Sequence, residues 1–485
     1  MTKLLFAFYL TLVFFFLLFI NLYYLEGIPH VPDSAAYLFM AKMFATGHII
    51  MPIPASPEHF NFFPGILSID NGKWLFQYPF GHPLLLAIGI FIGMPNIIPP
   101  LVGTLFVLIL YLIAKEVFDR KTALFTLILP ILSPFFLENA SSFMSHNTAA
   151  FYLILSLYFS IRFCKSRNVW HALLSGLFVG LLFNTRPLTA LPFILLNSSI
   201  LFFYKNSRQM HSFVLFLTGL FPLLFLWLIY NYISTGNPLA SQYYLQSRGM
   251  LPFENPTLFL ASLQKHIENV KILLQNFGPM AFNWPKLITY GFLFIPFALR
   301  RNTFWDHIFF IGLFTLPLTY FFYDGTFIMY GPRFWYEILP FAILLSARSL
   351  ALAYELIPKI TIFFFVVLIF LSFAKLFGFI PTTNPDYFSP LRLNDLKGFN
   401  FVDKRIINEV KTKQIHNAVV FVKDCNNNWW CYGSVFSQNS PTLDTDIVYA
   451  KDLGNPYNIA LMDFFEGRSF YRIDYYTLDL KEIHY

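Results

Sequence analysis

Long apolar runs recur along most of the chain, and they constrain the fold more than any other feature. A helix that crosses a bilayer needs about 20 mostly apolar residues. The sequence therefore predicts eleven membrane-spanning helices, at residues 4–23, 97–114, 122–137, 147–163, 170–185, 187–204, 212–231, 285–299, 305–323, 334–354 and 360–379. The first is interpreted as a retained helix rather than a signal peptide, because no small-residue cleavage site follows it. The run 83–93 is too short to span and is expected to be interfacial or re-entrant.

Short basic loops orient these helices, since cytoplasmic loops carry an excess of Lys and Arg. With the N-terminus in the cytoplasm, the inner side receives loops 115–121, 162–169, 205–211, 300–304 and 348–359, all of which are basic. Counting 83–93 as a span would move the next four of these loops to the other side. We therefore expect a multi-pass protein of the cell membrane with two long outer loops, 24–82 and 232–284, and an extracytoplasmic C-terminal segment.

Charged residues are distributed unevenly along the chain. They make up 35 of residues 1–380 but 24 of the 105 residues 381–485, and only the second share approaches the ~25% of a soluble domain. Three prolines in "PTTNPDYFSP" mark a boundary near Pro381. The sequence therefore predicts a transmembrane domain, 1–380, and a soluble extracytoplasmic domain, 381–485, whose segments "NAVVFVKD", "DIVYAKD" and "RSFYRID" are typical of the strands of an α/β fold.

Composition and motifs exclude several classes of function. With 12% charged and 56% hydrophobic residues the chain cannot be a soluble multidomain enzyme, and its net charge of +7 lies in small groups between apolar runs, so nucleic-acid binding is not indicated. GxxxxGK[ST], GxGxxG, HExxH and CxxC are absent, so nothing supports a cytosolic nucleotide or structural zinc. A donor used at the outer face would more naturally be carried by a lipid.

The three cysteines fit the same topology. Cys164 falls on the inner side, where thiols stay reduced. Cys425 and Cys431 both fall in the external domain around "NNNWW", so a disulfide between them is a candidate, with two unpaired cysteines as the alternative.

Asp33 is the leading candidate for chemistry. In "HVPDSAAYLFMAKMFATG" it follows Pro32 and precedes a segment of helical spacing, at the N-cap or in the first turn of a helix beside the outer membrane face. Asp is also a favoured N-cap residue, so a purely structural role is the alternative.

Two arginines at the outer face are candidates for anion binding. Arg186 ends the fifth predicted span and Arg333 starts the tenth, against the bias that orients the chain. A guanidinium group suits a phosphate geometrically, although pairing with Glu138 or Glu337 is the simpler alternative. His82 and His146 are weaker candidates for the same ligand, each with the alternative of being only a polar residue at an interface.

An ordered series of segments resembles membrane glycosyltransferases of the GT-C superfamily, nearest to the branch of the protein O-mannosyltransferases and the lipid A aminoarabinose transferase. The segments are "PDSAAYLFMAKMFATG", "QYPFGHPLLLAIG", "FMSHNTAAF", "GLLFNTRPLTALP", "NYISTGNPL" and "YGPRFWYEILPF". The resemblance covers most of residues 1–350. It implies an inverting transfer of a sugar from a polyprenyl-phosphate-linked donor to a glycan, lipid or protein acceptor of the cell envelope.

The resemblance also implies that Asp33 is the general base. From the residues themselves we expect Arg186 and Arg333 to bind the donor phosphate with help from His82 and His146. The residues expected to shape the pocket are Tyr78, Tyr336 and Glu337. All are expected around one cavity. The family often has Asp-Glu where this chain has Asp33 and Ser34, and one carboxylate is a poor site for a divalent cation, so no metal or other cofactor is expected.

Two other classes of function remain open at this level. A lipid or solute transporter, or a flippase, would need charges or broken helices at mid-membrane, and few are found. A non-catalytic membrane scaffold would leave the outer arginines and Asp33 without a role.

Overall fold

In a computed structural model, the chain is described over residues 2–70, 72–204, 209–241, 256–323, 325–384, 386–423 and 428–484. It divides into two compact units, each formed by separate stretches of sequence. The first joins Met1–Ile20, Pro99–Ile229 and Ser247–Leu396, and the second joins Asn21–Ile98, Tyr230–Gln246 and Lys397–Tyr485. The second unit thus combines the predicted first outer loop with most of the C-terminal segment, a grouping that the sequence did not predict.

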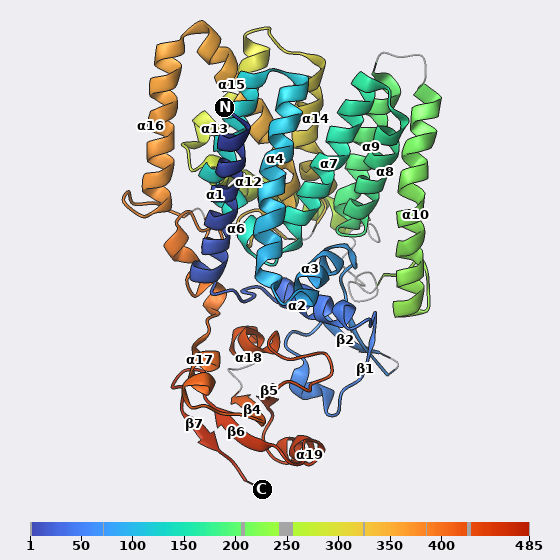
Figure 1. The fold of residues 1–485 in the computed structure, drawn as a ribbon, viewed down its shortest axis with the longest axis vertical. Helices are drawn as coiled ribbons and strands as arrows, with labels where there is room; N and C mark the ends of the chain where they lie inside the picture. The colour runs from blue at the N-terminus through green and yellow to red at the C-terminus, as the bar shows by residue number, and fades with distance from the viewer. Residues whose placement is uncertain are drawn as a thin grey trace. The chain divides into compact units, whose positions relative to one another are not determined.

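The first unit is a bundle of long helices that run side by side (Figure 1). Most of its helices begin at a proline or directly after a residue whose side chain caps the first turn. Their bounds are α1 Lys3–Phe19, α4 Ile98–Val117, α5 Arg120–Ile128, α6 Pro134–Ser141, α7 Ser145–Ser166, α8 Val169–Phe183, α9 Pro187–Phe203, α10 Gln209–Thr235, α12 Pro256–Phe282, α13 Lys286–Ala298, α14 Phe304–Thr319, α15 Leu339–Leu356 and α16 Pro358–Leu376.

Six helical stretches in the described residues are long and apolar enough to cross a membrane. They are Lys3–Tyr24, Pro95–Val117, Ser145–Ser166, Met210–Thr235, Arg333–Leu356 and Pro358–Leu376, and each coincides with a predicted span. Four other predicted spans are the shorter apolar helices α8, α9, α13 and α14. The chain is therefore a helical, multi-pass membrane protein, and the full count of eleven spans stays a prediction.

The expectation of one continuous helix over 122–137 is wrong. α5 and the 3₁₀ turn after it, Arg120–Leu132, are bent by 71° against α6, Pro134–Ser141. Pro130 and Pro134 lack the backbone N–H that a continuous helix needs, which explains the break.

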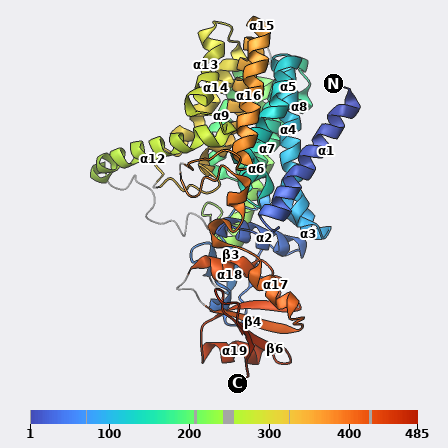
Figure 2. The same ribbon diagram turned by 90° about the vertical axis from the view of Figure 1, so that its left-hand side faces the viewer.

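Helix α12 lies within the segment expected as the second outer loop. It runs across the direction of the neighbouring helices of its unit (Figure 2). His266, Leu273, Phe277 and Met280 are buried along it, at a spacing that places them on one face. The loop prediction missed this helix because polar residues such as Lys265 and Glu268 interrupt the apolar pattern.

Two glycines set the approach of α8 and α10. A Cβ atom on Gly176 would lie 1.9 Å from the carbonyl oxygen of Phe216, and one on Gly219 would lie 2.1 Å from that of Leu173. Small residues at such crossings let helix backbones pack closely in a membrane.

The second unit contains α2 (Pro32–Ala45), α3 (Gly81–Phe91) and two sheets. The smaller sheet is antiparallel, with strand order β1-β3-β2, from Met51–Pro52, Lys73–Phe76 and Leu67–Asp70. The larger has the order β5-β4-β6-β7, from Ile447–Asp452, Ala418–Lys423, Ser469–Ile473 and Leu480–Glu482.

The larger sheet confirms that the C-terminal segment is α/β. β4 pairs in parallel with β5 and β6, and β7 is antiparallel to β6. Its helices are α17 Arg405–Thr412, α18 Trp429–Phe436 and α19 Tyr457–Phe464. The three segments expected as strands are β4, β5 and β6.

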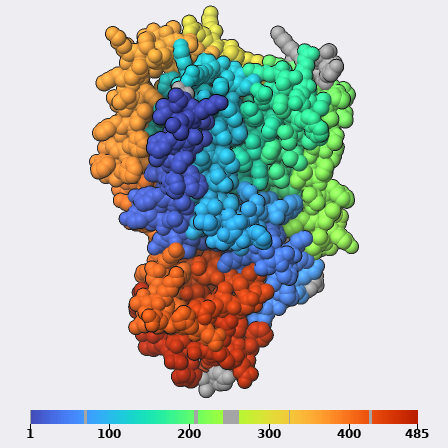
Figure 3. Space-filling model, in the orientation of Figure 1, coloured from blue at the N-terminus to red at the C-terminus, as the bar shows by residue number. Residues whose placement is uncertain are grey.

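The C-terminal segment packs directly on α2 within the second unit. Lys42 Nζ donates to the carbonyl oxygens of Ser437 and Asn439 at 2.6 and 2.9 Å, and Phe39 stacks on Phe436. In Figure 3 the blue surface of residues that belong to the second unit adjoins the red surface of the C-terminal segment. The turn that carries Asp33 is therefore built into the same body as the larger sheet.

Candidate functional site

Asp33 lies in the first turn of α2. Val31 is extended because it precedes Pro32, and Pro32 begins the helix. The local turn is closed by Ser34, whose Oγ donates to the carbonyl oxygen of Val31 at 2.7 Å and accepts from its N–H at 3.2 Å. Of the two expected positions, Asp33 thus occupies the first turn and not the N-cap.

Tyr78 connects Asp33 to α3. Its hydroxyl donates to Asp33 Oδ1 at 2.7 Å. Burial, and then the charge of Asp33, raise the pKa of Tyr78 well above its usual value, so this phenol remains a donor at neutral pH. The Tyr37 ring contacts both Tyr78 and His82, with ring centroids 4.5 and 5.0 Å apart. Asp33, Tyr78 and His82 therefore belong to one cluster of the second unit, to which Tyr37 adds a residue that the sequence did not single out.

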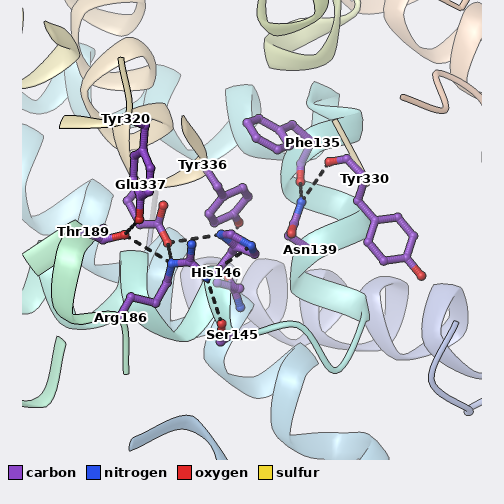
Figure 4. Close-up of polar contacts among 11 residues, drawn as sticks. Phe135, Asn139, Ser145, His146, Arg186, Thr189, Tyr320, Tyr330, Tyr336 and Glu337 are labelled. Carbon is purple, nitrogen blue, oxygen red and sulfur yellow. Dashed lines mark hydrogen bonds and ion pairs between the residues drawn. The ribbon is translucent and has the colours of Figure 1, made fainter. Parts of the chain in front are cut away.

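Arg186 is held at the turn between α8 and α9. Pro187 begins α9 and keeps Arg186 outside the helix. Its Nε lies 3.3 Å from both Glu337 Oε1 and Thr189 Oγ1 (Figure 4). Its Nη1 lies 3.4 Å from Ser145 Oγ and 3.5 Å from His146 Nε2. The expected alternative of pairing with Glu337 is thus confirmed for Arg186.

Glu337 is completely buried and faces two basic groups. It lies in the 3₁₀ turn Arg333–Ile338, just before α15, and its side chain is 0% exposed. Its Oε1 is 3.3 Å from His146 Nδ1 as well as from Arg186 Nε. The neighbouring Tyr336 donates to Asn147 Oδ1 at 3.2 Å, which ties the same turn to α7. Glu138, the other acid considered as a partner, is also buried, at 2% exposure.

Arg333 and Arg186 share one aromatic ring. Their guanidinium carbons lie 5.3 and 5.4 Å from the centroid of Phe334, within the range of a cation–π interaction. Phe334 in turn stacks on Tyr320, whose hydroxyl lies 2.7 Å from Thr189 Oγ1. Two cations are therefore gathered around one aromatic stack in the first unit.

The structure thus groups the predicted residues into two clusters. Arg186, Arg333, His146, Tyr336 and Glu337 lie in the first unit, and Asp33, Tyr78 and His82 lie in the second. Sequence reasoning missed the supporting residues Ser145, Thr189, Tyr320 and Phe334. Thr189 had a signal, since it follows Arg186 by three residues on a helix that Pro187 starts. The single cavity expected around both groups stays a prediction.

Two of the three cysteines, Cys164 and Cys431, lie in the described residues. Cys164 is free and buried, and Cys431 is disulfide-bonded. Cys425, its expected partner, lies outside the described residues. In the part of the chain that is described, no three His, Cys, Asp or Glu side chains gather as a metal site would require.

Comparison with known proteins identifies related sequences and folds. Residues 83–230 match the family described as dolichyl-phosphate-mannose-protein mannosyltransferase. A search of curated proteins returned no match. Among solved structures, the chain is similar to ArnT from Cupriavidus metallidurans bound to undecaprenyl phosphate, with 12% identity and a TM-score of 0.57 over 98% of this chain and 93% of that chain. The apo state of ArnT gives 13% identity and a TM-score of 0.54 over 96% and 92% of the two chains.

The likeness to ArnT extends over nearly the whole of both chains, and it includes the C-terminal segment with its mixed sheet. At this level of identity it establishes a common fold. The family match covers a part of the chain that runs from α3 to α10 and includes Arg186 and His146. The comparisons agree with the expectation from the ordered segments: residues 83–230 match the protein mannosyltransferase family, and the chain shares the fold of ArnT.

Proposed function

We propose that the chain moves a sugar from a polyprenyl-phosphate-linked donor to a hydroxyl group of a glycan, lipid or protein acceptor, with inversion, at the outer membrane face. The observation that carries the proposal is the pair of guanidinium groups around Phe334, 5.3 and 5.4 Å from its centroid. A planar guanidinium matches a phosphate group better than an ammonium does. The fold of ArnT, a protein solved with undecaprenyl phosphate bound, supports the same class of donor.

The proposed step is a single displacement at the anomeric carbon of the donor sugar. The acceptor oxygen forms a bond to this carbon as the bond to the phosphate oxygen breaks, and the electron pair of the broken bond leaves on the phosphate. Asp33 accepts the proton of the acceptor hydroxyl. The products are the glycosylated acceptor and free polyprenyl phosphate. Tyr78, which donates to Asp33 at 2.7 Å, holds the carboxylate in one orientation.

Arg186 and Arg333 are proposed to bind the donor phosphate and to stabilise the charge that develops on it as the sugar leaves. His146 assists by contacting Arg186, and His82 is a weaker candidate for the same ligand. Tyr336 and Glu337 are proposed to shape the pocket beside the arginines in the first unit, and Tyr78 is proposed to shape the surroundings of Asp33 in the second unit. The burial of Glu337 supports a dry environment in which such electrostatic contacts are strong.

The membrane arrangement is part of the proposal. We propose a cell-membrane protein with eleven spans, a cytoplasmic N-terminus, a transmembrane domain of residues 1–380 and an extracytoplasmic domain of residues 381–485. The distribution of basic loops supports this orientation. A single cysteine placed at Lys481 in a Cys164→Ser background should react with a membrane-impermeant maleimide in intact cells, and one placed at Arg301 should react only after lysis. Labelling in the opposite pattern would reverse the orientation.

A transfer assay tests the function. The purified full-length chain is incubated with the lipid-linked sugars extracted from its host membrane and with a membrane extract as the acceptor. The release of free polyprenyl phosphate is measured by mass spectrometry. We expect time-dependent release that requires the protein. If purified, folded protein releases none while the extracted lipids are consumed by the host's own membranes, the proposed donor is wrong.

A further inference from the structure

We infer that Glu337 is a positioning residue that fixes the plane of the Arg186 guanidinium for the donor phosphate, and that His146 acts with it and not on the phosphate. The inference deepens the proposed function and rests on it. Glu337 Oε1 forms an ion pair with Arg186, 3.3 Å from Nε, and the N–H of the same Nε donates to Thr189 Oγ1 at 3.3 Å. A contact at Nε fixes the orientation of the guanidinium, whose terminal nitrogens carry the fork that suits a phosphate.

The protonation of His146 follows from its partners. Arg186 Nη1 lies 3.5 Å from His146 Nε2, and an arginine nitrogen can only donate, so Nε2 carries a lone pair. The proton of the neutral ring is then on Nδ1, which lies 3.3 Å from Glu337 Oε1. A nitrogen of each basic partner thus lies 3.3 Å from Glu337 Oε1, and His146 also accepts from Arg186. Both ring nitrogens are thus directed at Glu337 and Arg186 and not at a phosphate.

Burial makes this arrangement rigid. Glu337 is 0% exposed, and His146 is 1% exposed. A buried carboxylate is costly unless it stays paired, so Glu337 cannot swing away from its two partners without a penalty. Arg186, which is 11% exposed, remains on the open side of the three residues. The Glu337 carboxylate therefore stays fixed, and the Arg186 guanidinium is the part of the three residues that a ligand can reach.

If Glu337 acted only through its negative charge, it would weaken the binding of a phosphate by Arg186 rather than strengthen it. A carboxylate beside Arg186 offsets the positive charge that attracts a phosphate. If Glu337 acted only through its charge, Glu337→Gln would make anion binding tighter. If Glu337 acts by orienting Arg186, the same change should make binding weaker. The sign of the change therefore separates the two accounts.

Undecaprenyl phosphate is the probe. Its affinity for the purified full-length chain is measured by quenching of tryptophan fluorescence, for the wild type, Glu337→Gln, Arg186→Lys and the double variant. We expect Glu337→Gln to weaken binding about tenfold in the wild-type background, typical of a lost charge-assisted contact. In the Arg186→Lys background the same change should alter binding less than about twofold, because contacts that act through one another are not additive. Glu138→Gln, which removes another buried carboxylate of the first unit, is the matched control and should bind like the wild type.

Each outcome bears on the inference. Tighter or unchanged binding by Glu337→Gln, or an equal loss in both arginine backgrounds, would overturn the positioning role while leaving the donor class intact. Absence of binding by the wild type would overturn the proposed function together with the inference. If Glu337→Gln does not fold, Glu337→Asp is used, since it keeps the charge but shortens the reach to Arg186. It should weaken binding in the wild-type background and not in Arg186→Lys, and an equal loss in both would again overturn the inference.

Discussion

Asp33→Asn separates the chemistry of Asp33 from its structural role. Asn keeps the size of the side chain and an oxygen that can still accept from Tyr78, which now donates to Asp33 at 2.7 Å. The change removes only the charge and the ability to take a proton. Since Ser34 and not Asp33 closes the turn at Val31, the start of α2 should remain intact.

The loss of stability and the loss of turnover expected for Asp33→Asn can be compared in size. Loss of a carboxylate from the first turn of a helix costs about 0.3–1 kcal/mol through the helix dipole. The weaker hydrogen bond from Tyr78 adds about 1 kcal/mol. Removal of a general base lowers turnover by roughly 10²–10⁴-fold, or about 2.7–5.5 kcal/mol of barrier. We therefore expect turnover to fall far more than stability.

The transfer assay measures turnover, and thermal unfolding in the same detergent measures stability. Asp33→Asn should melt within a few degrees of the wild type and bind undecaprenyl phosphate normally. Ser34→Ala is the control, because it removes the local turn contacts but leaves the carboxylate. It should lose stability and keep its turnover. An Asp33→Asn protein that turns over at the wild-type rate would refute the assignment of Asp33 as the base.

Three further predictions follow from other parts of the molecule. Arg186→Lys and Arg333→Lys should each raise the KM for the lipid donor about tenfold, because lysine keeps the charge but loses the planar fork. Arg301→Lys is the control. An unchanged KM in both site variants would contradict the phosphate role. Burial lowers the pKa of His30 and of His59, so the unfolded chain binds more protons below pH ~6.5 and stability should fall as the pH drops from there. His30→Gln with His59→Gln should flatten this decline in thermal melts, and an equally steep decline would show that other groups cause it. Gly176→Ala should lower the free energy of unfolding by about 1–3 kcal/mol, because its Cβ would lie 1.9 Å from the Phe216 carbonyl oxygen. Gly291→Ala is the control and should be neutral or stabilising, because a Cβ there meets nothing within 4 Å. Equal melting temperatures of the two variants would contradict the close crossing of α8 and α10.

The sequence predicted the elements that depend on local pattern. Apolar runs of helical length located the spans, β-branched runs located β4, β5 and β6, and Pro32 located the start of α2. The break between α5 and α6 was missed because hydropathy is high on both sides of it, although Pro130 and Pro134 carried the signal. α12 was missed because its pattern is amphipathic and lies in a segment defined only by its flanking spans.

The sequence predicted fewer of the contacts between distant segments. The sequence offered Glu337 as one of two partners for Arg186, and only the fold shows that the carboxylate lies 3.3 Å from Nε. Nothing in the sequence connected Phe334 to both arginines, since a cation–π contact has no spacing rule when the residues come from different helices. The packing of the C-terminal segment on α2 through Lys42 could not be predicted either, because a half-buried lysine that donates to backbone carbonyls looks like any other lysine in the sequence.

The lipid content of cells that lack this chain tests the central claim most directly. The chain is deleted in its host, and the polyprenyl-phosphate-linked sugars are quantified by mass spectrometry. We expect one such lipid to accumulate and one glycosylated product to disappear. Expression of the wild-type chain should restore both, and Asp33→Asn at the same protein level should restore neither. Unchanged pools of every polyprenyl-phosphate-linked sugar in the deletion strain would contradict the proposed transfer.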